Sequence, residues 1–163
     1  MAEFTSTDFR ATVGAFATGV TVVTTRGDEH SYGMTANAFT SVSLDPPLVL
    51  VCVMANSEGS AHIEQNRCFA VNVLHVDQEP LSRYFASRDR PRGRDAFKEV
   101  AHRTAASGSP ILDGAVAYMD CRLHNAHDAG DHQIFIGEVL DLGLDPDGKP
   151  LVFHGGTYKP IGG

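Results

Sequence analysis

The chain of 163 residues has the composition of an ordinary globular protein, with 42% hydrophobic and 20% charged residues. This length predicts a single domain spanning residues 1–163. The formal net charge of −7 disfavours nucleic acids and anionic membranes as partners. Three widely spaced cysteines, the lack of a membrane-length apolar segment and the lack of a signal-peptide pattern together predict a cytoplasmic protein without a membrane partner.

The N-terminal part of the chain predicts a helix and then a strand. Apolar side chains recur at helical spacing over residues 5–16, where Ser6 or Thr7 can cap the helix. The β-branched segment 20–25 (VTVVTT) predicts the first strand. No Gly-x-Gly-x-x-Gly fingerprint occurs in the sequence, so a nicotinamide cofactor would have to bind without a Rossmann unit.

Residues 31–55 form a segment with two different halves. The first half, residues 33–43, is small and polar, and we expect a loop that leaves room for a planar polar ligand. An ordinary Ser/Thr-rich connection has the same composition, so composition alone leaves both interpretations open. The second half, residues 48–54 (LVLVCVM), is a short apolar run behind Pro46 and Pro47, which predicts a fully buried strand.

The remaining predicted elements are mostly strands. Short helices are expected over residues 60–65 and 77–87, and strands over residues 69–74, 115–123, 133–142 and 151–154. The loop 88–94 carries four arginines and one aspartate, which is typical either of phosphate contact or of a solvated loop, and no single arginine is assigned a role. Recurring strands with few, short helices predict a small closed barrel with helical decorations.

One histidine-rich segment contains enough ligand types for a mononuclear metal site. Its candidate ligands are His124, His127, Asp128, Asp131 and His132. The same residues suit a polar hairpin connection between two strands, and no further ligand stands at a diagnostic spacing. No metal site is therefore predicted.

Two short segments at strand ends are better candidates for a binding site. His132, in Gly130-Asp131-His132, opens a strand directly after a loop, where an imidazole can bind an amide or phosphate or transfer a proton near neutral pH. Residues 154–158 (HGGTY) combine a strand end, two flexible glycines and the aromatic ring of Tyr158, which is suited to stacking.

The order of these motifs resembles a known family. The motifs are ATGVTVVTT, YGMTANAFTSVSLDPPLVLVCV, NS-x-x-S, FAVNVL, GDH-x-I-x-I-GEV and PLVFHGGTY, and they extend from about Phe9 to Tyr158. Together they resemble the short-chain flavin reductases, the reductase components of two-component flavin-dependent monooxygenases in the FMN-binding split-barrel superfamily. The resemblance implies a mainly β protein with short helices, folded as a split, Greek-key-like β-barrel. It also implies a homodimer with flavin in a cleft beside the subunit interface.

The resemblance implies a set of flavin-contacting residues. Residues 33–37 would lie along the isoalloxazine ring, where backbone N–H groups can stabilise the negative charge that develops on reduction. Residues 41–43 would contact the ring or the ribityl chain, and residues 52–57 with Ser60 would approach the ribityl chain and the phosphate. The individual flavin-binding candidates are Gly33, Met34, Thr35, Ala36, Asn37, Ser41, Val42, Ser43, Cys52, Ala55, Asn56, Ser57 and Ser60.

The same resemblance implies a reaction. His132 would be the catalytic residue on the nicotinamide side, and Tyr158 would help to hold the nicotinamide cofactor. The expected function is an NAD(P)H:flavin oxidoreductase that uses FAD or FMN, with NADH the expected donor and NADPH the alternative. It would pass free reduced flavin to a partner monooxygenase.

Three alternatives remain open at this point. The first is a flavin-retaining oxidase of the pyridoxamine-phosphate-oxidase type on the same barrel. The second is a non-enzymatic flavin- or haem-binding protein with this fold. The third is a metal-dependent hydrolase or dioxygenase that uses His124, His127 and His132.

Overall fold

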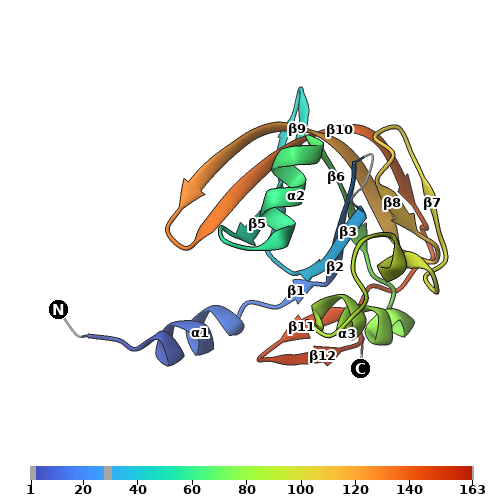
Figure 1. The fold of residues 1–163 in the computed structure, drawn as a ribbon. Coiled ribbons are helices and arrows are strands. Elements are labelled where there is room, and N and C mark those ends of the chain that lie inside the picture. The colour runs from blue at the N-terminus through green and yellow to red at the C-terminus, as the bar shows by residue number, and fades with distance from the viewer. Residues whose placement is uncertain (1–2, 28–30, 163) are drawn as a thin grey trace.

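The computed structural model describes residues 3–27 and 31–162, and their elements are mostly strands (Figure 1). In chain order the elements are α1 (Ser6–Gly14), β1 (Thr18–Gly19), β2 (Thr21–Arg26), β3 (Ser31–Ala36), β4 (Phe39–Leu44), β5 (Pro47–Met54), α2 (Glu58–Asn66), β6 (Cys68–Val73), η1 (Val76–Gln78), α3 (Glu79–Ala86), η2 (Gly93–Phe97), β7 (His102–Thr104), β8 (Pro110–Leu112), β9 (Ala117–Ala129), β10 (His132–Leu144), β11 (Val152–His154) and β12 (Thr157–Lys159). None of the described helices is both long enough and apolar enough to span a bilayer.

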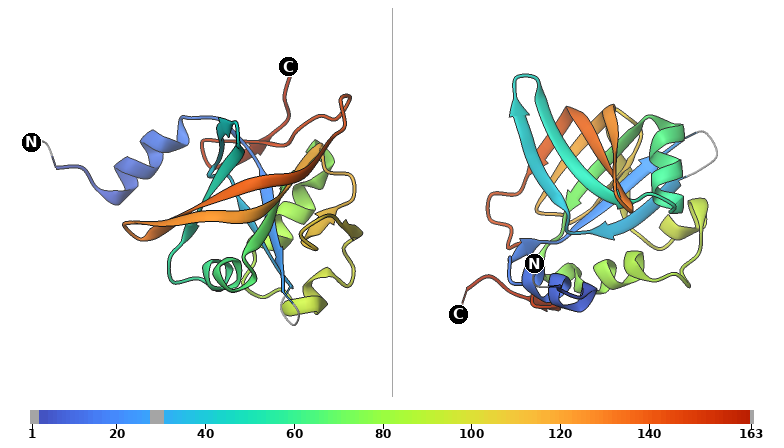
Figure 2. Two further views of the ribbon diagram at one scale, coloured as in Figure 1. Left: turned by 90° about the horizontal axis from the view of Figure 1, so that it is seen from above. Right: turned by 90° about the vertical axis from the view of Figure 1, so that its left-hand side faces the viewer.

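Seven antiparallel strands form one strongly curved sheet in the order β3-β2-β6-β9-β10-β5-β4. The two edge strands, β3 and β4, are joined by only Asn37 and Ala38, so the opposite edges of the sheet must meet at one corner. The sheet therefore curls into a barrel (Figure 2). Because β3 and β4 do not pair with each other in the described chain, the barrel is split at this place. The prediction of a mainly β split barrel is confirmed, and the closed barrel expected from composition is wrong.

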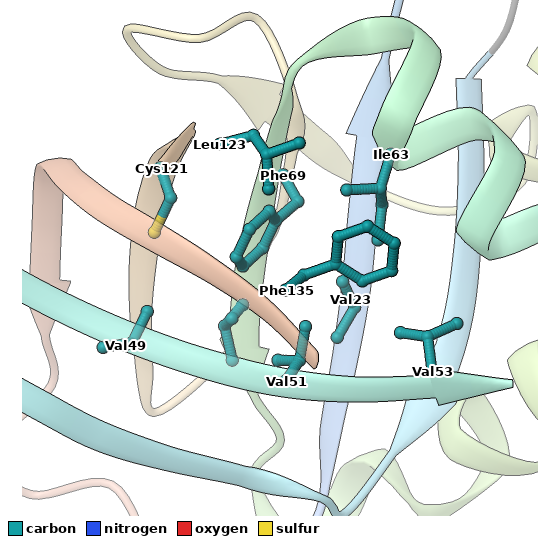
Figure 3. Packing of buried hydrophobic residues seen from close by; sticks show 10 residues of the cluster. Val23, Val49, Val51, Val53, Ile63, Phe69, Cys121, Leu123 and Phe135 are labelled. Atoms are coloured by element: carbon teal, nitrogen blue, oxygen red, sulfur yellow. The ribbon is translucent and has the colours of Figure 1, made fainter. Parts of the chain in front are cut away.

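The barrel interior is filled by one apolar cluster. Figure 3 shows Val49, Val51 and Val53 pointing from β5 toward Phe69 and Phe135 in the interior. All five side chains are buried. The residues of β5 between these valines face the other way and are only partly buried. The prediction of a fully buried strand at residues 48–54 is therefore wrong, because this apolar run belongs to a sheet that buries only one of its faces.

A second apolar cluster lies outside the barrel, where α3 and η2 cover β2 and β3. It includes Val22 of β2, Phe85 of α3, Phe97 of η2 and Leu112 of β8. Phe85 and Phe97 are in ring contact, with centroids 5.4 Å apart. This cluster fixes α3, and therefore the arginine-rich loop that follows it, against the edge of the sheet.

Asn72 of β6 is a polar residue at the centre of the fold, with no exposed surface. Its side-chain oxygen accepts a hydrogen bond from the Leu112 amide at 2.8 Å, and its side-chain nitrogen donates to the Val22 carbonyl at 3.1 Å. The amide thus attaches the short strand β8 to the barrel while satisfying backbone groups that would otherwise be buried without partners.

Helix α1 differs from its prediction in its boundaries and its surroundings. Thr5, rather than Ser6 or Thr7, is the N-cap, and it forms a capping box with Asp8. The helix ends at Gly14 and projects from the barrel (Figure 1). The apolar side chains of Phe9 and Val13 in the helix, and of Phe16 just after it, remain exposed to solvent.

Two predicted loops are strands instead. Residues 33–43 belong mainly to β3 and β4 rather than to a loop, because their Thr, Ser, Phe and Val side chains pair readily with neighbouring strands. Residues 124–132 do not form a long polar connection either. β9 and β10 continue as a two-stranded ribbon that turns only at Gly130 and Asp131. Such a ribbon has two solvated faces at its tip, so a polar sequence does not prevent strand pairing there.

Smaller differences concern the boundaries of elements. The helix expected over 60–65 begins at Glu58, and the one expected over 77–87 is a short η1 followed by α3. The last predicted strand, residues 151–154, corresponds to β11, and the sequence did not predict its hairpin partner β12.

Candidate functional site

A cavity of about 390 Å³ lies where three elements converge. One wall is the start of β3 (residues 31–33), another is the end of β5 with the start of α2 (residues 54–58), and the arginine-rich loop 88–93 covers both. Three flavin candidates, Gly33, Asn56 and Ser57, therefore line one cavity although they are distant in the sequence.

The β3 wall presents backbone groups rather than side chains. β3 is an edge strand that pairs only with β2 among the described strands, so its other edge has no strand partner. Arg90 donates a hydrogen bond to the Gly33 carbonyl at 2.6 Å, which shows that Gly33 points its backbone toward this open edge. Thr35, two residues further on, points its backbone groups in the same direction, because the direction of backbone N–H and C=O groups along a strand repeats every second residue. The open edge can therefore offer amide donors to a flat polar ligand.

The small size of Gly33 has a packing cause. A Cβ atom on Gly33 would lie 2.6 Å from a ring carbon of Phe85 and 3.1 Å from one of Phe97. Both rings are buried in the outer apolar cluster. The neighbouring side chains of Met34 and Ala36 pack against the barrel cluster. From the sequence, we expected these small residues to leave room for a ligand. At Gly33, however, the absence of a side chain is required by the close packing of Phe85.

The N-terminus of α2 forms the opposite wall. Ser57 is its N-cap, and its hydroxyl accepts from the Ser60 amide at 3.2 Å and donates to the Met54 carbonyl at 2.7 Å. The amides of Glu58 and Gly59 occupy the first helical turn, where no intrahelical acceptor is available. Ser60 itself is buried, and its hydroxyl hydrogen-bonds the Gln133 side chain. Backbone amides, more than the Ser60 hydroxyl, are thus what α2 offers to an anion.

His132 stands at the tip of the β9–β10 ribbon, next to this wall. It lies opposite Met54 in the β10–β5 register, and the Ala55 amide donates to the Asp131 carbonyl at 3.0 Å. The imidazole is 43% exposed, and its Nδ1 lies 2.7 Å from the Asp131 carboxylate. This hydrogen bond lowers the pKa of the Asp131 carboxyl, which stays ionised and can only accept. Nδ1 therefore carries a proton, and Nε2 is left to meet a ligand.

Tyr158 does not line this cavity and is linked to β3 through Ser82. Its hydroxyl lies 2.9 Å from the Ser82 hydroxyl, and the Ser82 carbonyl accepts from the Thr35 hydroxyl at 2.6 Å. The guanidinium of Arg83 stacks over the Tyr158 ring at 4.8 Å. Among the described residues, no hydrogen bond or ring contact joins Tyr158 to His132. The two predicted nicotinamide-side residues are therefore held by different elements.

The remaining candidates lie around the split of the barrel. Asn37 is exposed at the corner between β3 and β4. Ser41 and Ser43 flank a bulge at Val42, which leaves the Val42 side chain 46% exposed. Burial raises the pKa of the half-buried Cys52 thiol, so this group stays protonated and brings no charge to the site.

In the described part of the chain, the histidine-rich ribbon included, no group of three potential metal ligands comes together. Between His124 and His127 the regular alternation of β9 side chains does not hold, because the β9–β10 pairing shifts register between Ile136 and Gly137. The imidazole of His124 lies 3.8 Å from Glu138 instead.

Sequence reasoning missed the roles of the arginine-rich loop and of Tyr32. Arg88, Arg90 and Arg92 all line the cavity, and Arg90 also stacks over the ring of Tyr32 at 5.2 Å. The excess of arginine was the one available signal, but nothing local indicated which surface the loop covers. For Tyr32 the sequence contained no signal.

The geometry agrees with the family comparison. The model of the flavin reductase like domain family matches residues 13–162. The chain belongs to this family. The match confirms the resemblance inferred from the order of the motifs.

Relatives of known activity cover nearly the whole chain. An NADH-dependent FAD reductase from Streptomyces globisporus is 44% identical over 92% of this chain and 82% of its own. An NADH-dependent flavin reductase from a Rhodococcus species is 43% identical over 98% of this chain and 88% of its own. The solved flavin reductase component of a bacterial two-component tryptophan halogenase is 41% identical, with a TM-score of 0.92 over 98% of this chain and 99% of its own.

The packing of Gly33 generates a prediction about stability. Gly33→Ala should lower the free energy of unfolding of the ligand-free protein by about 1–3 kcal/mol, because the added methyl group overpacks Phe85 and Phe97. Denaturant unfolding of the purified protein measures this change. Gly19→Ala is the matched control, since no atom lies within 4 Å of its added Cβ. Equal stability of the two variants would contradict the packing explanation.

Proposed function

We propose that this chain is an NADH-dependent flavin reductase. The observation that carries the proposal is the cavity in which the open edge of β3, the N-terminus of α2 and three arginines converge beside His132. This combination suits a ligand with a flat polar ring and an anionic tail. Relatives at more than 40% identity are named as NADH-dependent reductases of FAD or flavin, and one solved relative from Streptomyces globisporus is described in complex with NAD and FAD fragments.

The residues present fit a flavin. The unpaired edge at Gly33 and Thr35 can donate backbone hydrogen bonds to the ring system, and the amides at the start of α2 with the loop arginines can hold a phosphate. When bound, the flavin supplies the acceptor for a hydride, so that NADH and a proton are converted to NAD⁺ and reduced flavin. The chain itself contributes binding, alignment and fixed dipoles. The complete set of predicted cofactor contacts in residues 33–60 remains part of this proposal.

His132 is proposed to hold the nicotinamide. Asp131 fixes the imidazole orientation through Nδ1, which leaves Nε2 free to bind the carboxamide or a phosphate of NADH. Hydride transfer between two cofactors needs no general acid at the carbon centre, so the residue acts by positioning the donor. Tyr158, held by Ser82 and stacked by Arg83, is proposed to support the same cofactor from the β3 side.

The reduced flavin is proposed to leave for a partner monooxygenase. A relative from Rhodococcus jostii, 40% identical over 94% of this chain, is named as the reductase subunit of a flavin-dependent monooxygenase. None of the structural observations favours a flavin-retaining oxidase, a carrier without activity or a metal enzyme.

We also infer that residues 1–163 act as a single domain, and that the protein works in the cytoplasm, where NADH is available and its three free cysteines stay reduced.

One assay tests the proposed activity directly. NADH should be oxidised when the purified protein is mixed with FMN or FAD under air, and the loss of the nicotinamide absorbance measures the rate. NADPH should support a lower rate, and NADH without added flavin should support almost none. Absence of oxidation with every pairing of nucleotide and flavin would contradict the proposed function.

Replacement of His132 separates nicotinamide binding from flavin binding. His132→Ala should raise the KM for NADH roughly tenfold, the factor expected for loss of one hydrogen bond of about 1.4 kcal/mol, while flavin affinity stays unchanged. Steady-state kinetics and flavin titration provide the two readouts. His124→Ala is the control, because its imidazole is 44% exposed and lies on the same ribbon. An unchanged KM for NADH in His132→Ala would contradict the proposal that His132 holds the nicotinamide.

We infer that the protein is a homodimer with its flavin cleft beside the subunit interface. Large apolar side chains in and beside α1, at the end of β4 and at the end of β10 are exposed, and a second copy would cover them. They are Phe4, Phe9, Val13, Phe16, Leu44, Leu142 and Leu144.

Sedimentation analysis tests the dimer. The protein should sediment at twice its chain mass of 17.5 kDa. The double variant Phe9→Ser, Val13→Ser should shift the equilibrium toward the monomer, because it removes exposed apolar surface from α1. Thr12→Ser is the control on the same helix. A wild-type protein that sediments as a monomer would contradict this assembly.

A further inference from the structure

An ion pair inside the proposed flavin cavity joins two of its walls. Arg92, from the loop that covers the cavity, pairs with the carboxylate of Glu58, the first residue of α2. Both residues line the cavity, together with Arg88 and Arg90. Their side chains are 67% and 49% exposed, so the pair is accessible to a ligand from solvent.

The position of Glu58 is one that a phosphate would also occupy. A carboxylate at the start of a helix is stabilised by the helix dipole and by amides without intrahelical acceptors. The same features, with an arginine opposite, form a binding site for a phosphate. Arg92 can form its strongest paired hydrogen bonds with only one of the two anions at a time.

We propose that Glu58 is a resident anion that competes with the phosphate of a bound flavin for Arg92, and thereby sets how tightly flavin is held. This inference rests on the proposed function, because it concerns the flavin of the same cavity. Arg90 differs from Arg92, since it is held by the Gly33 and Ser87 carbonyls and by the ring of Tyr32. Among the arginines that line the cavity in the described chain, Arg92 is the one paired with a carboxylate.

The competition has a functional consequence. A reductase that hands reduced flavin to another protein must bind the flavin for one turnover and then release it. When the phosphate leaves, the Glu58 carboxylate pairs with Arg92 again. This competition lowers the affinity for flavin without removing any contact to the isoalloxazine ring. The carboxylate also replaces the ligand's charge, so that Arg92 is not left unpaired when the cavity empties.

Two flavins that differ only in the phosphate test the proposal. Glu58→Gln should tighten FMN binding by about two- to fivefold, the range expected for an exposed ion pair that no longer competes, and should slow FMN release. Riboflavin, which has no phosphate, should bind the variant and the wild type equally. Equilibrium titration by flavin fluorescence measures both affinities, and the FMN difference should shrink at high salt.

A matched control is available on the next helix. Glu79 is the first residue of α3 and pairs with Arg83 at 2.6 Å, but neither residue lines this cavity. Glu79→Gln should leave both flavin affinities unchanged. Arg92→Gln should weaken FMN but not riboflavin, and adding Glu58→Gln to it should no longer tighten FMN.

Three other outcomes would each contradict a different part of the proposal. An unchanged or weaker FMN affinity in Glu58→Gln, with riboflavin binding intact, would show that Glu58 does not compete. An equal change for both flavins would show that Glu58 acts through the shape of the cavity. A wild-type protein that binds neither flavin would overturn the proposed function itself, which distinguishes that failure from the first two.

Discussion

The two-residue connection between β3 and β4 is the constraint on which the rest of the structure depends. Asn37 and Ala38 are too few to let the two edge strands separate, so the seven-stranded sheet has to curl until its edges meet. The edges meet at a corner without pairing along their length. The barrel is therefore split, and the backbone of β3 keeps an unpaired edge, which edge strands normally protect. Here that edge faces a cavity and is available for a ligand.

The packing outside the barrel turns this edge into a site. Phe85 of α3 packs directly against Gly33, which holds the helix close to β3. The loop that follows α3 is consequently positioned over the cavity, where Arg90 caps the Gly33 carbonyl. On the opposite side, Ser57 begins α2 beside the tip of the β9–β10 ribbon. A rigid scaffold thus presents backbone donors and cations from separate loops, as is common for cofactor sites.

The electrostatics of the cavity differ from those of the whole protein. The chain carries a formal net charge of −7, yet three arginines and one glutamate line the cavity. A positive cavity in an acidic protein attracts anionic nucleotides locally while the remaining surface repels them. Charge balance within the cavity, rather than total charge, therefore determines how anions are held and released.

The sequence by itself determined the local features of this protein. It indicated most of the strands, the short helices, the turn before His132 and the order of motifs that marks the family, because these depend on neighbouring residues. It did not reveal that residues 33–43 form two edge strands, nor that one face of β5 lies outside the barrel. These depend on strand pairing between distant segments. The arginine loop is the clearest example, since Arg90 and Gly33 are 57 residues apart and only the tertiary structure brings them into contact.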